Sequence, residues 1–229
     1  MTNAGQPEAT PAPAKAQLTQ TRILETALAL FRERGFEATT MRAIAERAGV
    51  SLGNAYYYYG SKDHLVQAFY GRVHEEHLAL CDARLGSMRS LKERLRFTMR
   101  SRLELIEPYH GFAAVLFRSA ADPQSPLNPF SAESRPVREQ ATALLARVIA
   151  GSNAHMPEDL GAALPNLLWV YQMGLVLFWI HDTSQGRRRT MQLVDGSVDL
   201  VVKLIGLASL PFMRPVRRMV LRLVENVER

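Results

Sequence analysis

The stretch from Thr40 to Lys62 constrains the fold more than any other part of the chain, because it describes two short helices joined by a tight turn. Thr40 and Ser51 are preferred N-cap residues, since a side-chain hydroxyl accepts a hydrogen bond from a free amide of the first turn. Gly49 supplies the left-handed backbone that ends the first helix, and we expect Gly60 to end the second. The first helix has an apolar face made of Ile44, Ala45 and Ala48. This arrangement is a helix-turn-helix, whose second helix enters the major groove of DNA.

Four consecutive tyrosines, Tyr56 to Tyr59, lie in the second of these helices. Successive helical residues are about 100° apart, so the four rings cover most of the circumference and cannot all be buried. We expect Val50, Ala55 and Tyr59 to face the core. The outward surface then suits a DNA groove, because glycine permits close approach, asparagine reads an adenine edge and tyrosine donates to phosphates. That surface consists of Leu52, Gly53, Asn54, Tyr57 and Tyr58. The alternative is an aromatic-rich core helix of an all-α enzyme.

The segment from about Leu18 to His77, about a quarter of the chain, resembles the N-terminal domain of the TetR family of bacterial transcriptional repressors. The resemblance rests on residues 22–31 (RILETALALF), 35–40 (GFEATT), 44–51 (IAERAGVS), 56–57 (YY) and 60–62 (GSK). The family usually has Leu, His and Phe where this chain has Ala55, Tyr58 and Tyr59. These departures leave the operator sequence open.

The resemblance implies a role for particular residues. In the family, positions matching Thr40, Tyr57 and Lys62 hold the DNA backbone, and neighbouring positions face bases or nearby phosphates. Leu52 cannot form a hydrogen bond, so we expect it to contact a thymine methyl group. Lys62 opens the next helix, where a cation and free amides together bind a phosphate. The predicted DNA-binding residues are Thr40, Arg42, Ser51, Leu52, Gly53, Asn54, Tyr56, Tyr57, Tyr58 and Lys62. Neither a cofactor nor a metal is expected.

Composition and charge add less than the motif. The 229 residues suffice for a small module and a larger domain, and 47% hydrophobic with 22% charged residues is typical of a soluble globular protein. The net charge of +6 favours a polyanionic partner. However, residues 15–77 contain eight Lys and Arg against seven Asp and Glu, and the excess lies at 89–118 and after 187. The single cysteine, Cys81, excludes an internal disulfide and suits a cytoplasmic protein.

We predict an all-α chain in three parts. Residues 1–16 lack apolar periodicity and the features of a signal peptide, and we expect a disordered tail. Its only cation, Lys15, leaves open a contact with the minor groove. Residues 17–63 form the helix-turn-helix domain, in which a helix from Leu18 to Arg34 covers the motif. Residues 64–229 form a larger helical domain for regulation and dimerisation.

The larger domain begins with a long helix from Lys62 to about Leu85 that links the two halves. Its predicted inward residues are Leu65, Phe69, Val73 and Leu80. Three possible metal ligands, His74, His77 and Cys81, share one face of this helix. One straight helix rarely places more than two ligands around an ion, and no second cluster occurs elsewhere. We therefore interpret this face as partly buried and polar, and predict no metal site. Further helices are expected at 91–106, 112–120 and 137–149, with a loop at 122–130.

The 21 residues from Leu160 to Ile180 carry no formal charge. Their length and composition would suit a transmembrane helix followed by basic residues. Pro165, Asn166 and Gln172 interrupt the segment, however, and a helix that is apolar all round also suits a buried interface. In TetR-like proteins the last long helices of two subunits pair into a four-helix bundle. We therefore predict a homodimer through the helices at about 160–182 and 187–208, without a membrane.

The final predicted helix runs from Val216 to Val227. Val216, Val220, Leu223 and Val227 would lie on one side, with Arg217, Arg218 and Arg222 opposite. We expect this helix to pack on its own domain, with binding to a membrane surface as the alternative.

The sequence predicts a dimeric repressor that binds a palindromic DNA operator and is released by a small apolar or amphipathic effector. Binding cavities are mostly apolar, so the candidate lining residues are Met99, Leu103, Phe112, Leu116, Phe117, Phe130, Trp169, Gln172, Met173 and Phe178. Tyr109 and His110 are further polar candidates. No nucleophile elbow, phosphate loop or metal cluster supports an enzyme. An activator and a DNA-binding protein that responds to no ligand are the alternatives within DNA binding.

Overall fold

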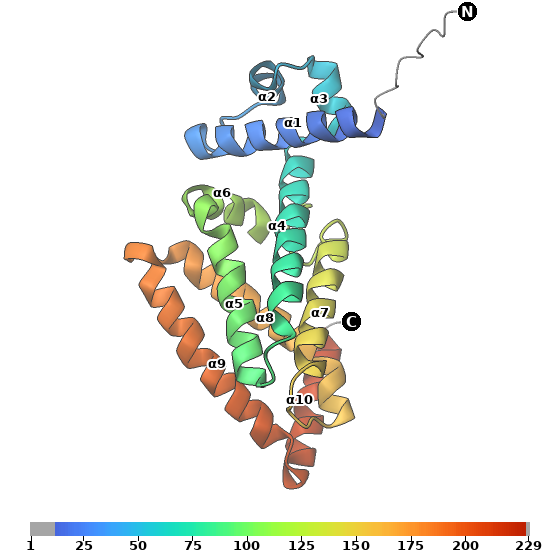
Figure 1. The fold of residues 1–229 in the computed structure, drawn as a ribbon, viewed down its shortest axis with the longest axis vertical. Coiled ribbons are helices and arrows are strands. Elements are labelled where there is room, and N and C mark those ends of the chain that lie inside the picture. Colours follow the sequence, from blue (N-terminus) through green and yellow to red (C-terminus); the bar gives the residue numbers. More distant parts are fainter. Residues whose placement is uncertain (1–11, 228–229) are drawn as a thin grey trace, which may run out of the picture.

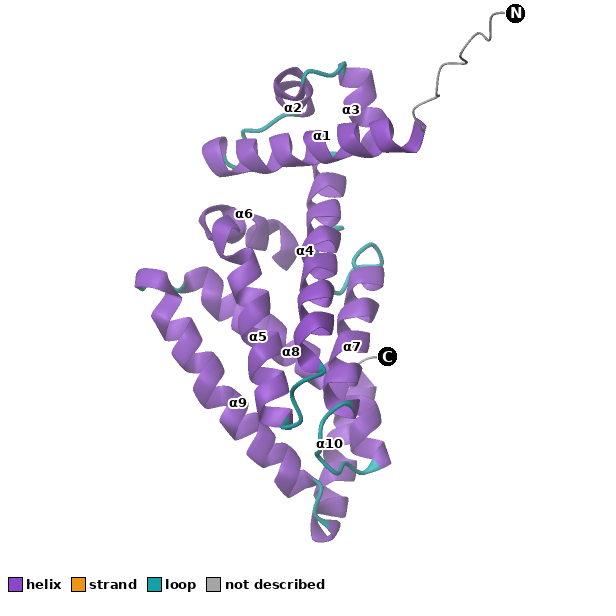
Figure 2. Ribbon diagram, viewed as in Figure 1, coloured by secondary structure: helices purple, strands orange, loops and turns teal. Residues whose placement is uncertain are grey.

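The computed structural model describes residues 12–227, apart from the side chains at 12–13, 114–115, 118–119, 220–221 and 223–227. The described part consists of helices and connecting loops (Figure 2). The first helix, α1, spans Ala12–Arg34 and therefore includes residues 12–16, which the sequence assigned to the tail. The remainder of the predicted tail lies outside the described residues.

Helices α2 (Met41–Ala48) and α3 (Leu52–Tyr58) form the predicted helix-turn-helix on top of α1 (Figure 1). The hydroxyl of Thr40 accepts a hydrogen bond from the Ala43 amide at 3.1 Å, and the Ser51 hydroxyl accepts one from the Asn54 amide at 3.1 Å. Gly49 has a φ of 65° and ends α2, as predicted. The prediction for Gly60 was wrong by one residue: α3 ends at Tyr58, and its C-cap is Tyr59, where the backbone is extended.

The core of this half matches the apolar spacing of the sequence. The predicted face of α1 is buried, and it consists of Ile23, Leu24, Ala27, Leu30 and Phe31. Phe36 and Ala55 complete this core, and Val50 is half-buried against it. Tyr59 is also buried, and its hydroxyl donates a hydrogen bond to the Gln20 carbonyl at 3.3 Å. This contact fixes the end of α3 against α1.

Helix α4 (Lys62–Leu85) has the predicted bounds and connects the two halves of the molecule (Figure 1). Leu65, Phe69 and Val73 are buried, as predicted. The prediction for Leu80 was wrong, because this side chain is 37% exposed. Four-residue steps from Val73 lead to the buried His77 and Cys81, so the inward row of the helix continues there instead.

The larger half contains α5 (Leu91–Ile106), α6 (His110–Ala121), α7 (Arg135–Ala150), α8 (Glu158–His181), α9 (Arg188–Ala208) and α10 (Arg214–Val227). Three short 3₁₀ turns, 107–109, 185–187 and 211–213, join these helices. Helix α9 lies along α5, while α7 packs on α8 (Figure 1). Every predicted helix is present, and most extend by one to three residues beyond their predicted ends.

A buried arginine, Arg94, joins the C-terminal ends of α4 and α7. Arg94 on α5 donates hydrogen bonds to four carbonyl groups, those of Leu85 at 2.5 Å, Met88 at 3.0 Å, Arg147 at 3.0 Å and Val148 at 2.7 Å. Carbonyl groups at the end of a helix lack intrahelical partners. One guanidinium group therefore satisfies the ends of both α4 and α7.

The prediction for α10 was wrong at two positions. Arg217 is buried rather than outward, because its side chain donates to Asp159 at 2.9 Å and to the Ala208 carbonyl at 2.7 Å. Val216, predicted to lie on the apolar face, is exposed. The other predicted apolar residues of this helix, Val220, Leu223 and Val227, have side chains outside the described part.

Candidate nucleic-acid interface and ligand cavity

The outward surface of the helix-turn-helix carries most of the predicted DNA-binding residues. Thr40, Arg42, Ser51, Gly53, Asn54, Tyr56 and Tyr57 are exposed, and the Tyr57 side chain is 81% exposed. Leu52 and Tyr58 are half-buried and pack partly against the core, so less of each side chain is free for a contact. The hydroxyls of Thr40 and Ser51 already act as helix caps. Both caps and the Tyr59 contact hold α3 in a fixed orientation with Asn54 outward.

Lys62 opens α4, as the sequence predicts, but its side chain also has partners within the protein. Its ammonium group donates hydrogen bonds to the carbonyls of Phe36 at 2.7 Å and Glu37 at 3.4 Å, and it lies 4.4 Å from the centre of the Phe36 ring. An ammonium group has three donors, so one remains for a phosphate. Lys62 therefore first ties α4 to the loop between α1 and α2.

The larger half encloses a cavity of about 600 Å³ between α4, α5, α6, α7 and α8. A volume of this size matches sites for small molecules. The loop before α7 forms part of the wall through Pro129 and Phe130, and the Phe130 ring meets Trp169 edge-on at 5.2 Å. Gln67 on α4 holds this loop, since its amide donates to the Ser134 hydroxyl at 3.1 Å and to the Pro126 carbonyl at 2.5 Å.

Most of the predicted cavity residues line this space: Tyr109, Phe112, Leu116, Phe117, Phe130, Trp169, Gln172 and Met173. Met99 and Leu103, also on α5, do not line it; both side chains are buried in the hydrophobic core. Phe178 points outward and is exposed. His110 sits beside the cavity, where its Nε2 is 2.8 Å from the Trp179 carbonyl and its Nδ1 is 2.9 Å from an Arg187 nitrogen.

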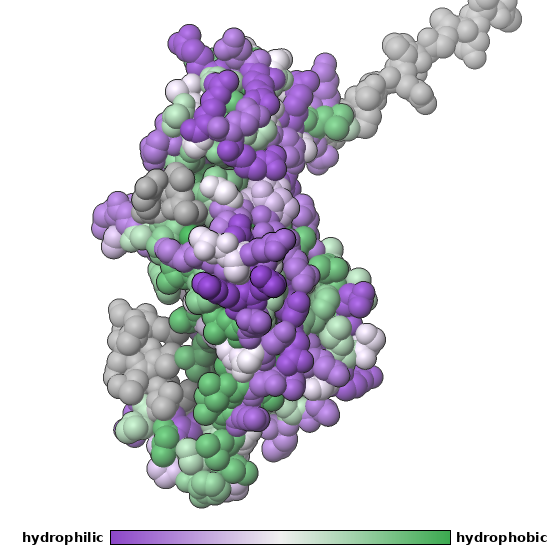
Figure 3. All heavy atoms as spheres, turned by 90° about the vertical axis from the view of Figure 1, so that its left-hand side faces the viewer, coloured by the Kyte–Doolittle hydropathy of each residue, from purple (hydrophilic) through white to green (hydrophobic). Residues whose placement is uncertain are grey.

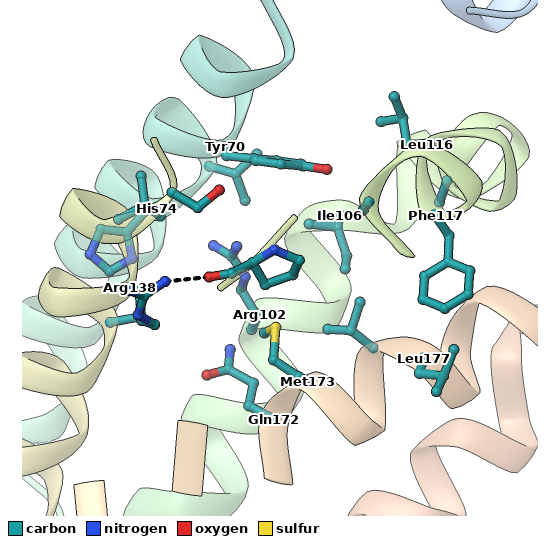
Figure 4. A pocket seen from close by; sticks show the side chains of 18 of the residues that line it. Tyr70, His74, Arg102, Ile106, Leu116, Phe117, Arg138, Gln172, Met173 and Leu177 are labelled. Atoms are coloured by element: carbon teal, nitrogen blue, oxygen red, sulfur yellow. Dashed lines mark hydrogen bonds between the residues drawn. The ribbon is translucent and has the colours of Figure 1, made fainter. Parts of the chain in front are cut away.

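The sequence identified Tyr109 and Gln172 but missed the other polar side chains of the cavity, which include Tyr70, His74, Arg102 and Arg138 (Figure 4). A usable signal was present for Arg102. It lies three residues after Met99 and four before Ile106, so a charged residue interrupts the apolar face of α5. A charge on such a face is unusual unless it has a partner.

The cavity wall is positively charged. Burial lowers the pKa of Arg102 to about 10, so it remains a cation at neutral pH. Burial, followed by the charge of Arg102, lowers the pKa of His74 to about 4. Burial raises the pKa of Tyr70 to about 12. Both neighbours of Arg102 are therefore neutral at pH 7, and neither Asp nor Glu occurs among the lining residues that the structure describes.

The face that carries His74, His77 and Cys81 is more buried than the sequence suggested, because all three side chains are nearly inaccessible. His77 Nε2 lies 3.1 Å from both the Thr98 carbonyl and the Ser101 hydroxyl. Burial raises the pKa of the Cys81 thiol to about 11. Among the His, Cys, Asp and Glu side chains that the structure describes, no group of three is placed to hold a metal ion.

Aromatic rings connect the cavity to the helix-turn-helix. Tyr109 and Phe112 both line the cavity, and Phe112 lies 6.2 Å from Phe31 on α1 between ring centres. Tyr109 lies 4.5 Å from Phe69 on α4, and its hydroxyl is 3.1 Å from an Arg72 nitrogen. A displacement of these two cavity residues therefore acts directly on α1 and α4.

Helices α8 and α9 expose an apolar stripe on one face of the molecule (Figure 3). We define the stripe by Val170, Leu177, Phe178, Leu193, Leu200, Leu204 and Leu207. The four leucines of α9 are spaced seven, four and three residues apart, as in helices that pair along an apolar seam. Helix α8 is also long and apolar enough to cross a membrane by length and composition, although core helices of soluble proteins meet the same criterion.

Two regions of the chain match models of known protein families. Residues 23–69 match the model of the bacterial regulatory proteins of the tetR family, and residues 94–223 match the tetracyclin repressor-like C-terminal domain. The transcriptional regulator TtgR of Pseudomonas putida is 40% identical over 85 residues, which are 34% of this chain and 40% of the relative. The repressor KstR of Mycolicibacterium smegmatis is 48% identical over 54 residues, 24% of this chain and 26% of the relative. The chain thus matches two fifths or less of the length of these two relatives.

Solved structures share the fold along most of the chain. A TetR transcriptional regulator from Nitrosomonas europaea has a TM-score of 0.62 at 18% identity, covering 80% of this chain and 97% of that one. FadR from Bacillus subtilis, solved in complex with stearoyl-CoA, has a TM-score of 0.62 at 14% identity with the same coverage. The matches to both halves, together with the helix-turn-helix and the all-helical larger domain, establish that this chain belongs to the TetR family of bacterial transcriptional regulators.

Proposed function

We propose that the chain is a dimeric DNA-binding regulator that represses transcription and is released by a small effector. Residues 17–63 would form the DNA-binding domain, and residues 64–229 the regulatory domain. The observation that carries the proposal is the outward surface of α3, which is capped, fixed against α1 and free of apolar cover at Asn54 and Tyr57. An exposed glycine, asparagine and tyrosine on one short helix have no role in the core but suit a DNA groove.

The apolar stripe supports the homodimer. Exposed leucines at regular spacing on two adjacent helices are costly in water, and a second copy would cover them around a two-fold axis. Discrimination of about 4–10 kcal/mol over non-specific DNA normally needs more contacts than one short helix makes. Two copies would place two α3 helices on one duplex and would read an inverted repeat.

The cavity supports regulation by a small molecule. It is mostly apolar and shares Tyr109 and Phe112 with the contacts to α1 and α4. A ligand that prefers the conformation with displaced residues would shift the chain away from the DNA-binding state. A tenfold loss of DNA affinity requires about 1.4 kcal/mol of such coupling.

Selection from random double-stranded DNA tests the proposal. The purified chain is mixed with the pool, and bound duplexes are recovered, amplified and sequenced over several rounds. We expect enrichment of an inverted repeat whose half-sites lie about one helical turn or a small multiple apart. The variant Tyr57→Ala, altered at an exposed residue, should enrich the repeat weakly. Failure of the wild-type chain to enrich any sequence would contradict the proposed function.

A further inference from the structure

The cavity wall contains a half-buried arginine, Arg102, without a counter-charge. The side chains that the structure describes give Arg102 no ion pair or hydrogen bond, and its Nη1 atom is buried without a partner. Nε2 of His74, which lines the same cavity, is also buried and unpartnered. A buried charge is strongly unfavourable unless it is paired, and buried polar atoms normally have partners. Two unsatisfied donor or acceptor groups in one cavity indicate that a bound molecule completes them.

The neighbouring side chains do not supply the missing charge. Tyr70 and His74 are neutral at pH 7, and Gln172 carries no charge. Arg138 adds a second positive charge, and it is oriented by the carbonyl of Pro129, which accepts from its Nη1 at 2.6 Å. With no carboxylate among the described lining residues, the wall has two arginines and an uncompensated positive potential.

Polar and apolar residues occupy different parts of the cavity. Figure 4 shows Arg102 near His74, Arg138 and Gln172, while an apolar group lies on the other side of the view. That apolar group consists of Ile106, Leu116, Phe117 and Leu177. A ligand that matches both parts needs an anionic end and an apolar body.

We propose that the effector is an amphipathic anion, with a carboxylate or phosphate group on an apolar body, and that Arg102 binds its charged end. The guanidinium group is planar and presents paired donors that fit either oxyanion. His74 Nε2 offers a further hydrogen bond, and the apolar body lies toward Phe117 and Leu177. This inference rests on the proposed function, and it adds the charge of the effector and the residue that recognises it.

Intrinsic fluorescence provides a test that needs no DNA. Both tryptophans of the chain, Trp169 and Trp179, line the cavity, so a ligand there changes their emission. The probes are decanoate, decyl phosphate and the neutral decanamide, titrated at one pH and salt concentration. We expect at least one anionic probe to bind at least tenfold more tightly than decanamide, a difference of about 1.4 kcal/mol. The anionic probe that binds more tightly shows whether the site prefers a carboxylate or a phosphate group.

Variants assign the preference to Arg102. Arg102→Met should abolish the preference for the anion over decanamide, and Arg102→Lys should keep part of it. The matched control is Arg89→Met, which removes the same charge from an exposed position outside the cavity and should retain the preference. Equal binding of anionic and neutral probes to the wild-type chain, or binding of none of them, would overturn the inference, whether or not a variant folds.

Failure of the inference can be separated from failure of the proposed function. Release of the chain from its selected DNA by a neutral compound alone would retain the proposed function and reject the anionic effector. Arg102-dependent binding of decanoate by a chain that enriches no DNA sequence would retain the ligand site and reject the regulator.

Discussion

At the scale of single residues, Asn54 and Tyr57 have different expected roles. Both are exposed on α3, but an amide reads a base edge whereas a phenol hydroxyl binds a phosphate. Asn54→Ala should relax preference at one base position by about 1–3 kcal/mol, while Tyr57→Phe should weaken binding to all sequences alike. Fluorescence anisotropy on the selected duplex and its single-base variants measures both effects. An unchanged base preference in Asn54→Ala would show that α3 faces DNA differently.

His77 predicts a pH dependence of stability. Burial first, and then the charge of Arg102, lower its pKa to about 3, whereas the unfolded chain binds this proton near pH 6.5. The unfolded state therefore holds more protons between these values, so stability is full above about pH 6.5 and falls as the pH decreases. The contribution to the slope is at most about 1.4 kcal/mol per pH unit.

The variant His77→Gln should accordingly show a shallower loss of stability between pH 6 and pH 4. Urea unfolding at fixed protein concentration measures the free energy of unfolding at each pH. His155→Gln, at an exposed position, is the matched control and should retain the wild-type slope. Identical slopes for all three proteins would contradict the assignment of a buried neutral imidazole at His77.

At the scale of elements, Arg94 should be critical for joining α4 and α7. Arg94→Met removes all four hydrogen bonds, at a cost of about 2 kcal/mol or more, although the Leu85 and Arg147 carbonyls keep backbone donors at Met88 and Gly151. Gly151→Ala should also destabilise, since an added Cβ would lie 2.3 Å from Nη2 of Arg94. Thermal and urea unfolding measure both, with Arg89→Met as the exposed control. Wild-type stability of Arg94→Met would contradict this role.

The contacts of α6 with α1 and α4 predict how a ligand acts at a distance. Tyr109→Phe keeps the ring against Phe69 but removes the hydroxyl that meets Arg72. We expect unchanged DNA affinity without ligand and a several-fold smaller loss of affinity with decanoate, because one hydrogen bond contributes about 0.5–1.5 kcal/mol. The ratio of the DNA dissociation constants with and without decanoate measures the effect. If Tyr109→Phe shows the same ratio as the wild-type chain, the cavity is coupled to the DNA-binding domain through other contacts.

Local features of the elements were predictable from sequence, whereas contacts between elements were not. The caps Thr40 and Ser51 and the turn at Gly49 depend only on neighbouring residues, and the sequence identified all three. Met99 and Arg102 lie on one turn of α5, yet the sequence assigned the wrong one to the cavity. That choice depends on how α4 and α8 pack around α5, which apolar spacing does not specify. Arg217 was misplaced for the same reason, because its partner Asp159 is distant in sequence.

At the scale of the whole molecule, DNA binding as proposed requires two copies joined through the apolar stripe. Leu200 is 57% exposed at the middle of the α9 seam, so a charge there leaves the folded monomer intact but opposes pairing. We expect Leu200→Glu to be monomeric. Ala146→Glu, which adds the same charge at an exposed position on α7, should remain dimeric.

Sedimentation of the chain, alone and on its selected duplex, measures whether two copies pair. We expect the wild-type chain to sediment as a dimer and an even number of copies to bind the inverted repeat. Leu200→Glu should sediment as a monomer and bind the same duplex at least tenfold more weakly, a loss of about 1.4 kcal/mol. A wild-type monomer that binds as one copy per duplex, with an affinity equal to that of Leu200→Glu, would rule out pairing through the apolar stripe.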